Sequence, residues 1–74
     1  MKNYAGLNRF RYTFRNLKTG ATSYFDEWCY GDIYQQIMRY KDNLKEMCLL
    51  NVSNDTHEII KVVHLFNGDV VYEK

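Results

Sequence analysis

The chain has 74 residues, enough for one compact domain over residues 1–74 and too few for a second. Ten lysines and arginines against nine aspartates and glutamates give a net charge of +1. This balance excludes an acidic nucleic-acid mimic and leaves only a local basic patch as a route to nucleic acid. Because 46% of the residues are hydrophobic, the composition is that of a folded domain and not of a disordered segment.

Nothing in the sequence points to secretion or to a membrane. The first eight residues contain no apolar signal segment, and no apolar run approaches the length of a membrane span. We therefore expect a cytoplasmic protein, in its own cell or in a host cell. The two cysteines, Cys29 and Cys48, should then be reduced and act as small buried hydrophobes, so that no disulfide reinforces the core.

The N-terminal segment predicts a β-hairpin. Residues 8–15 alternate with period two, which is the strongest strand signal in the chain. One face carries Phe10, Tyr12 and Phe14, and the other carries Arg9, Arg11 and Arg15. Residues 17–21 then predict a three-residue loop in which Gly20 takes the left-handed conformation of a G1 bulge.

This loop length fixes the expected register of the hairpin, with aromatic pairs on the core face and an ion pair on the other. The expected pairs are Phe14 with Tyr24, Phe10 with Trp28, and Arg11 with Glu27, and Asp26 falls beside Tyr12.

A helix is expected from Asp32 to about Asn43, although the pattern also allows an end at Met47 or Cys48. Asp32 as the N-cap and Gln35 three residues later form a capping box. An apolar stripe follows at helical spacing, and further apolar residues widen it towards half of the circumference. The stripe contains Ile33, Ile37, Tyr40 and Leu44, flanked by Tyr30, Tyr34 and Met38.

Three more strands are expected after the helix, over residues 46–52, 57–66 and 69–73, with a type I′ turn at Asn67-Gly68. The element order is then ββαβββ. This order predicts an α+β fold in which one helix packs on a small antiparallel sheet.

The last hairpin is apolar on both faces. One face carries Ile59, Val63, Leu65, Val70 and Tyr72, and the opposite face carries Ile60, Val62, Phe66 and Val71. A single helix covers only one face, and each exposed Val, Ile or Phe side chain forgoes about 1.5–3 kcal/mol of burial energy. Either the N-terminal hairpin folds over the second face, or another chain covers it, as a second copy or a larger target.

The expected protein interface combines this second face of the hairpin with the flank of the helix, because tyrosine and methionine are favoured at interfaces. Its residues are Ile60, Val62, Phe66, Val71, Tyr30, Tyr34 and Met38. On this hypothesis Val62→Glu dissociates the assembly and leaves the monomer folded.

No residue pattern indicates catalysis, a metal site or a cofactor. Cys29, Cys48, His57 and His64 lack the spacing of metal ligands, and two histidines seven apart on one strand fall on opposite faces. No nucleophile motif or phosphate-binding glycine loop is present. We therefore expect a protein that is not an enzyme.

RNA or single-stranded nucleic acid is the alternative partner. Arg9, Arg11 and Arg15 line one strand face, with Lys18 in the loop and Phe25 beside them. Arginines around an exposed aromatic ring are typical of single-strand platforms. A glutamate opposite Arg11 would neutralise part of this patch.

In size, in its richness in tyrosine and asparagine, and in its lack of a catalytic motif, the chain is similar to the small accessory proteins of large phages. Many of those proteins inhibit or redirect a host protein. The resemblance is compositional, and it transfers no residue roles. The expected function is therefore a non-enzymatic protein-binding module that inhibits or modulates a larger target, as a homodimer or through a hydrophobic sheet and helix surface.

Overall fold

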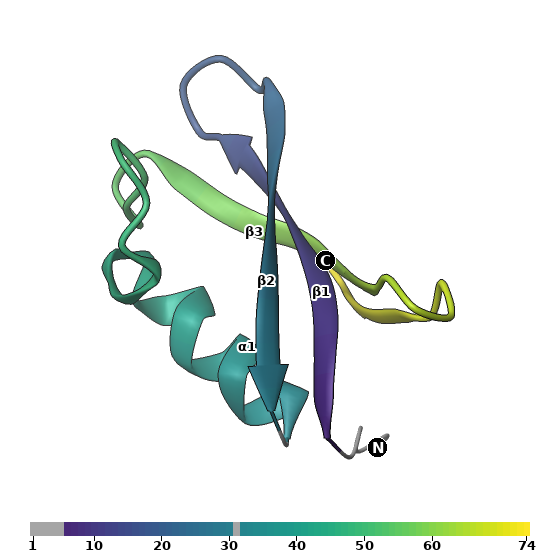
Figure 1. Ribbon diagram of the computed structural model, residues 1–74. Coiled ribbons are helices and arrows are strands. Elements are labelled where there is room, and N and C mark those ends of the chain that lie inside the picture. The colour runs from purple at the N-terminus through teal and green to yellow at the C-terminus, as the bar shows by residue number, and fades with distance from the viewer. Residues whose placement is uncertain (1–5, 31) are drawn as a thin grey trace.

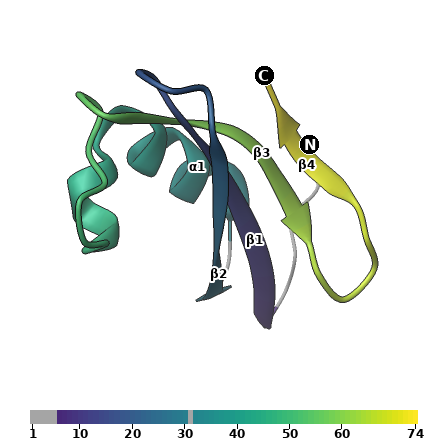
Figure 2. The same cartoon turned by 90° about the horizontal axis from the view of Figure 1, so that it is seen from above.

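The computed structural model describes residues 6–30 and 32–74. Its elements are β1 (Leu7–Asn16), β2 (Thr22–Tyr30), α1 (Ile33–Asp42), the 3₁₀ helix η1 (Leu44–Met47), β3 (His57–His64) and β4 (Val70–Glu73). The strands form one antiparallel sheet in the order β2-β1-β3-β4, and α1 lies on one side of it (Figure 1, Figure 2). The predicted α+β class, with one helix and a small antiparallel sheet, is confirmed.

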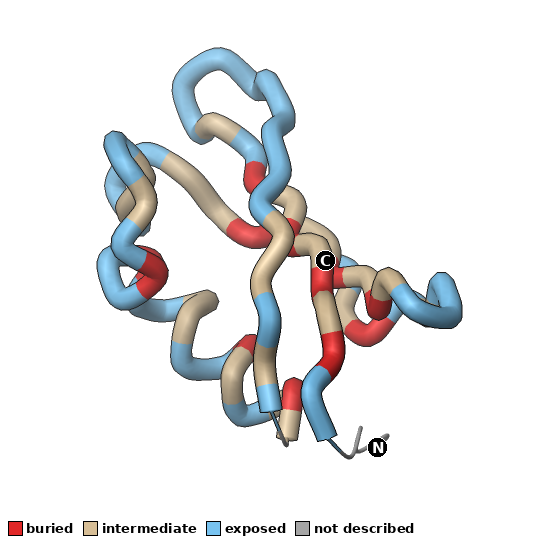
Figure 3. The backbone as a smooth tube through the Cα atoms, viewed as in Figure 1, coloured by how far each residue is buried: buried red, intermediate tan, exposed pale blue. Residues whose placement is uncertain are grey.

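The core lies between α1 and the aromatic face of β1. Phe10, Tyr12 and Phe14 are almost completely buried, as their alternation along the strand predicts (Figure 3). Ile33 and Ile37 face them from α1, also as predicted. The other buried hydrophobic residues are Leu44, Met47, Ile59, Val62 and Val71.

The helix begins and ends where the sequence predicts. Asp32 is the N-cap, and its carboxylate accepts a hydrogen bond of 2.9 Å from the backbone N–H of Tyr34. Asn43 is the C-cap, and its backbone N–H donates to the carbonyl of Tyr40 at 3.1 Å. None of the helices in the described part of the chain has the length and apolar character needed to span a bilayer.

The segment 46–52 does not form the predicted strand. Leu44 and Met47 enter the core from η1, one 3₁₀ turn apart, and the backbone then turns away from any extended conformation. Cys48 and Asn51 both have positive φ, 56° and 61°, which a strand cannot contain. The sheet therefore has four strands instead of five. Cys48 is also exposed, and not the buried hydrophobe expected from the sequence.

Both hairpins close with the same four-residue loop, so the predicted three-residue loop and the predicted type I′ turn at Asn67-Gly68 are both wrong. In the first loop the N–H of Asn16 donates to the carbonyl of Ala21, and the N–H of Gly20 donates back to Asn16, each at 2.8 Å. In the second loop His64, Asp69 and Gly68 repeat these bonds at the same distance. The glycines at the fourth loop position have φ of 77° and 79°.

The extra loop residue shifts the β1–β2 register by one residue. Each side chain of β2 therefore lies on the face opposite to the predicted one. Arg9 lies opposite Trp28, Arg11 opposite Asp26 and Thr13 opposite Tyr24. The predicted pairs Phe14–Tyr24, Phe10–Trp28 and Arg11–Glu27 are therefore wrong. Glu27, Cys29 and Phe25 take the core face of β2, and Tyr24, Asp26 and Trp28 take the other.

Two β-bulges rearrange the apolar faces of the last hairpin. Thr13 pairs with Lys61 but Phe14 pairs with Ile59, so Ile60 is an extra residue in β3. Val62 pairs with Tyr72 but Val63 pairs with Val70, so Val71 is an extra residue in β4. A bulge reverses the alternation, and Ile59 and Val62 consequently point into the same core.

The predicted second apolar face of this hairpin is therefore wrong. Val62 is 0% and Val71 is 7% exposed, so both belong to the core and neither is available to a partner. Ile60 is half-buried, and only Phe66, in the loop, remains exposed. The N-terminal hairpin does not cover a second face either, because β1 lies beside β3 in the same sheet.

Val62→Glu should consequently unfold the monomer, in contrast to the hypothesis drawn from the sequence. A buried charge without a partner costs about 3–5 kcal/mol, as much as the whole net stability of a domain of this size. Val63→Glu is the matched control, because Val63 is half-exposed and lies beside Arg11. Circular dichroism should show a folded Val63→Glu protein and an unfolded Val62→Glu protein; two equally folded variants would contradict the core assignment.

Candidate binding surface on the open sheet face

The sheet face turned away from α1 is the candidate functional site, and we refer to it as the open face. Its side chains alternate with the buried residues of β1 and with their partners on the neighbouring strands. From β1 they are Arg9, Arg11, Thr13 and Arg15; from β2, Tyr24, Asp26 and Trp28; from β3, Lys61 and Val63. The open face thus gathers the basic residues of β1 with Tyr24 and Trp28 of β2.

An arginine, an aspartate and a tyrosine form the centre of the open face. Arg11 donates from Nε to Asp26 Oδ1 at 2.8 Å and from Nη2 to Oδ2 at 3.0 Å. The same guanidinium lies 4.1 Å from the centre of the Tyr24 ring. The hydrogen bond from Arg11 lowers the pKa of Asp26, so this carboxylate is ionised at neutral pH. Tyr24 itself remains 62% exposed.

Trp28 is held between a cation and a second aromatic ring. The guanidinium carbon of Arg9 lies 5.1 Å from the centre of the indole, and the ring of Phe66 crosses it edge-on at 6.0 Å. Trp28 is still 50% and Phe66 60% exposed. Leu7 and Tyr30, paired with each other at the next position of the ladder, are exposed as well. One end of the hairpin therefore presents a fixed aromatic cluster to solvent.

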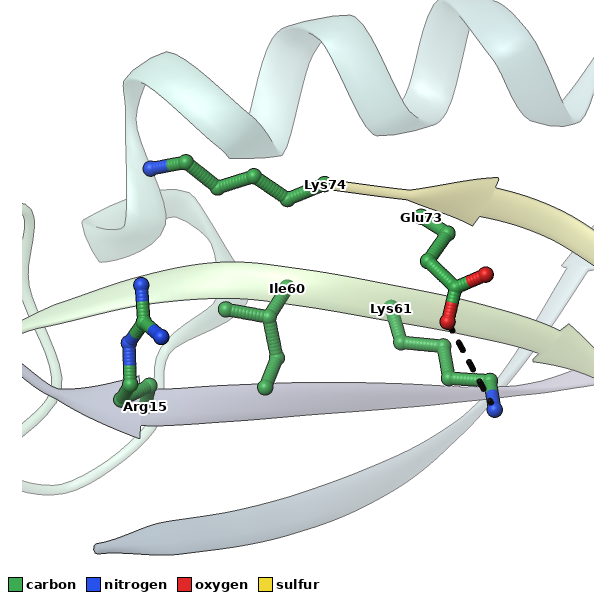
Figure 4. Close-up of a pocket in the computed structure, with 5 residues that line it drawn as sticks. All are labelled: Arg15, Ile60, Lys61, Glu73 and Lys74. Atoms are coloured by element: carbon green, nitrogen blue, oxygen red, sulfur yellow. Dashed lines mark ion pairs between the residues drawn. The ribbon is translucent and has the colours of Figure 1, made fainter. Parts of the chain in front are cut away.

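The other end of the sheet carries a charged hollow of about 250 Å³ (Figure 4). Arg15, Ile60, Lys61, Glu73 and Lys74 line it. Lys61 pairs with Glu73 at 4.0 Å, and Arg15 and Lys74 both pair with Glu58. The bond from Lys74, and to a smaller extent the bond from Arg15, lowers the pKa of Glu58. The cations of the hollow are thus already compensated by carboxylates of the same chain.

On the opposite face, Glu27 is the centre of a small group of titratable residues. The hydroxyl of Tyr40 donates to Glu27 Oε1 at 3.5 Å, while Glu27 Oε2 and the Tyr12 hydroxyl have no hydrogen-bond partner among the described residues. Burial raises the pKa of Glu27. Burial, together with the nearby charge of Glu27, raises the pKa of the Cys29 thiol to about 11. A thiol protonated at neutral pH is a poor nucleophile, so this group does not activate Cys29.

The residues of the predicted protein interface are dispersed. Tyr30 and Phe66 belong to the aromatic end of the sheet described above. Tyr34 and Met38 lie on α1, where they line a shallow hollow of about 410 Å³ together with Asp32 and Gln35. The helix flank and the terminal hairpin do not form one continuous surface, because Val62 and Val71 lie in the core.

Of the residues predicted to bind nucleic acid, the three arginines lie together in the structure. Arg9, Arg11 and Arg15 do share the open face, and Lys18 lies exposed in the hairpin loop. Phe25 does not join them, because it pairs with Tyr12 and so lies on the core face. The aromatic residues beside the arginines are instead Tyr24 and Trp28, which were predicted to lie on the core face.

The signal that could have revealed this lies in the first loop. The side chain of Asn16 accepts hydrogen bonds from the backbone N–H groups of Lys18 and Thr19, at 2.9 and 3.1 Å. An asparagine at this position stabilises a turn that begins one residue earlier than the three-residue loop requires. A turn that begins at Asn16 gives the observed register.

The histidines have structural partners. The Nε2 atom of the buried His64 lies 2.8 Å from Asn8 Oδ1, and His57 Nδ1 lies 2.7 Å from the hydroxyl of Thr56. Among the described residues, no group of three His, Cys, Asp or Glu side chains is placed to hold a metal ion.

Comparison of the chain with protein-family models, with curated proteins and with solved structures gives no match. The geometry of the open face is therefore the observation from which a function can be proposed.

The pKa shifts of Glu27 and Glu58 predict opposite effects of removing their charges. The raised pKa of Glu27 favours folding only below its unfolded value, and this contribution is lost as the pH rises. Glu27→Gln should therefore raise the melting temperature at pH 7 by a few degrees, and the gain should shrink towards about pH 4.

Glu58→Gln is the control of opposite sign. The lowered pKa of Glu58 stabilises the fold above its unfolded value, so this variant should melt earlier at pH 7 and converge on the wild type in acid. Thermal melts of the three proteins across this pH range measure both effects. Equal shifts of the same sign would contradict the two environments described above.

Proposed function

We propose that this chain is a small non-enzymatic protein-binding module that docks its open face on a larger protein and inhibits or modulates it. The observation that supports this most is Trp28, half-exposed yet held in place by Arg9 and Phe66. Tryptophan, tyrosine and arginine supply most of the binding energy at protein interfaces. A side chain that is already fixed before binding loses little conformational entropy when the partner arrives.

The charges around these rings also favour a protein partner. Arg11 is paired with Asp26, and Arg15 with Glu58, so the open face is only weakly cationic. Polyanions bind best where lysines and arginines are free to release the counterions of the phosphates. An aromatic centre with paired charges at its margin instead resembles the apolar core and polar rim of a protein interface.

The role of an inhibitor or modulator is also what the compositional similarity to phage accessory proteins implies. Such a protein acts in the cytoplasm, of its own cell or of a host, on a target larger than itself. A chain of 74 residues has little volume for an enclosed active site. By binding to a larger protein it can change that protein's activity without one.

A photo-crosslinking experiment tests this proposal directly. Benzoylphenylalanine in place of Phe66 should yield, in the cells that express the chain, a covalent adduct with a protein of discrete mass. The same probe in place of Leu50, which is 87% exposed in the connection after η1, is the matched control and should yield none. Combining the Phe66 probe with Trp28→Ala should reduce the adduct at least tenfold, because a hot-spot tryptophan contributes about 2 kcal/mol or more. Equal adducts at both positions, or an adduct that persists without Trp28, would refute the role of the open face.

Single-stranded nucleic acid is a second candidate, favoured by one specific observation. Tyr24 and Trp28 share the open face with Arg9, Arg11 and Arg15, and stacked guanidinium and aromatic groups are what nucleobases pack on. Trp28 is the only tryptophan in the chain, so its fluorescence reports directly on this face.

If nucleic acid binds here, oligouridylate or oligothymidylate should quench the fluorescence of Trp28 at low salt. The apparent affinity should fall steeply as salt is added, and Arg9→Ala should lower both the affinity and its salt dependence because a phosphate contact is lost. Lys45→Ala, which removes an exposed charge in η1, is the control and should change neither. Unchanged fluorescence at low salt would remove this candidate.

A further inference from the structure

β2 is an edge strand whose outer side is not used by the described part of the chain. It has nine residues and pairs only with β1. Because Asn16 bonds to Ala21, the residues of β2 that bond to β1 are Ser23, Phe25 and their alternate neighbours. The backbone groups of Tyr24, Asp26 and Trp28 therefore point outward, and no hydrogen bond of the described residues engages them.

This edge lacks most devices that protect exposed strands from pairing. β2 contains no proline, no lysine and no bulge along its length. Its half next to the loop, from Thr22 to Phe25, is exposed on both faces. In Figure 1 this end of the hairpin projects away from α1, and Figure 3 shows it in pale blue. Phe25 is 36% exposed although it lies on the core face of β2.

We propose that the β2 edges of two copies of this chain pair antiparallel, with Phe25 opposite Phe25 on the two-fold axis, to make a continuous eight-stranded sheet. The partner is a second copy because β2 is complementary to itself in this register. Tyr24 then lies opposite Asp26, Ser23 opposite Glu27 and Thr22 opposite Trp28. The outward backbone groups of Thr22, Tyr24, Asp26 and Trp28 of one strand then meet those of the other.

The other two-fold registers are excluded by charge or by length. A register centred on Asp26 places two aspartates directly opposite each other, and one centred on Glu27 does the same with two glutamates, which is destabilising. A register centred on Tyr24 would leave Trp28 opposite the loop and pair fewer residues. Among these four registers, only the one centred on Phe25 opposes each carboxylate with a neutral residue and still pairs β2 from Thr22 to Trp28.

Both faces of the sheet gain from this register. On the open face, Asp26 of one copy approaches Tyr24 of the other, whose ring lies under the guanidinium of Arg11, so opposite charges meet. On the core face, the two Phe25 rings meet in a non-hydrogen-bonded pair, where Cα atoms approach to about 4.5 Å and side-chain contact is closest. The inference does not depend on what the open face binds. The dimer would present two copies of the open face.

Two lysine substitutions on the same face of β2 test the register. Phe25→Lys places two like charges opposite each other on the axis and should abolish the dimer. Ser23→Lys adds the same charge two residues away but opposes it to Glu27 of the other copy, so the dimer should persist. Light scattering over a dilution series measures the mass of wild type and variants, and circular dichroism checks that each is folded.

Cysteine crosslinking gives a second readout that does not depend on dimer stability. In a chain with Cys29→Ser and Cys48→Ser, mild oxidation should link Phe25→Cys into a covalent dimer. Ser23→Cys should not form one, because its two copies would be about 13 Å apart, beyond the reach of a disulfide.

A wild-type protein that remains monomeric at the highest concentration would overturn the proposal. So would equal effects of Phe25→Lys and Ser23→Lys, or crosslinking at position 23 instead of 25. These outcomes are separate from those of the proposed function, because Phe66→benzoylphenylalanine reports a target on the open face whether or not the β2 edges pair.

Discussion

The burial of one aromatic face of β1 is the constraint on which the rest of the structure depends. Phe10, Tyr12 and Phe14 are covered by α1 on one side of the sheet, and β1 is flanked by β2 and β3 within it. The alternation of a strand then forces the arginines of β1 to the opposite side. The position of the basic residues on the open face is thus a direct consequence of how the core is filled.

This part of the fold can be predicted from the sequence because it depends only on local periodicity. The period-two pattern of β1 and the N-cap of α1 at Asp32 are both as expected. Which side chains of β2 and β3 share a face with those of β1 depends on single residues in loops and bulges. The periodicity of the sequence does not reveal these residues. One additional loop residue after Asn16 exchanges the faces of β2, and the additional residue at Ile60 moves Val62 into the core.

The same irregularities decide which part of the candidate site was found. The arginines were predicted because they belong to β1, whereas Tyr24 and Trp28 were missed because their face depends on the loop. The apolar excess in the last hairpin was real, but the bulges bring much of it to one side, where α1 and η1 help to cover it. The sequence pattern predicted that either the N-terminal hairpin or another chain covers the second face of β3 and β4. The residues that are left exposed instead lie mainly on β2 and near Trp28.

Exposed aromatic residues and an unprotected edge have a common origin in the length of the first hairpin. β2 is longer than the surface that a ten-residue helix can cover, so its part next to the loop, from Thr22 to Phe25, has no second layer. Each exposed ring there forgoes burial energy that a domain of this size needs. Pairing of β2 with another β2 would recover part of it, and docking of the open face would recover another part. The chain therefore places its largest unburied side chains on two surfaces that meet along β2: the edge that we propose pairs with a second copy, and the open face that we propose docks on a different protein.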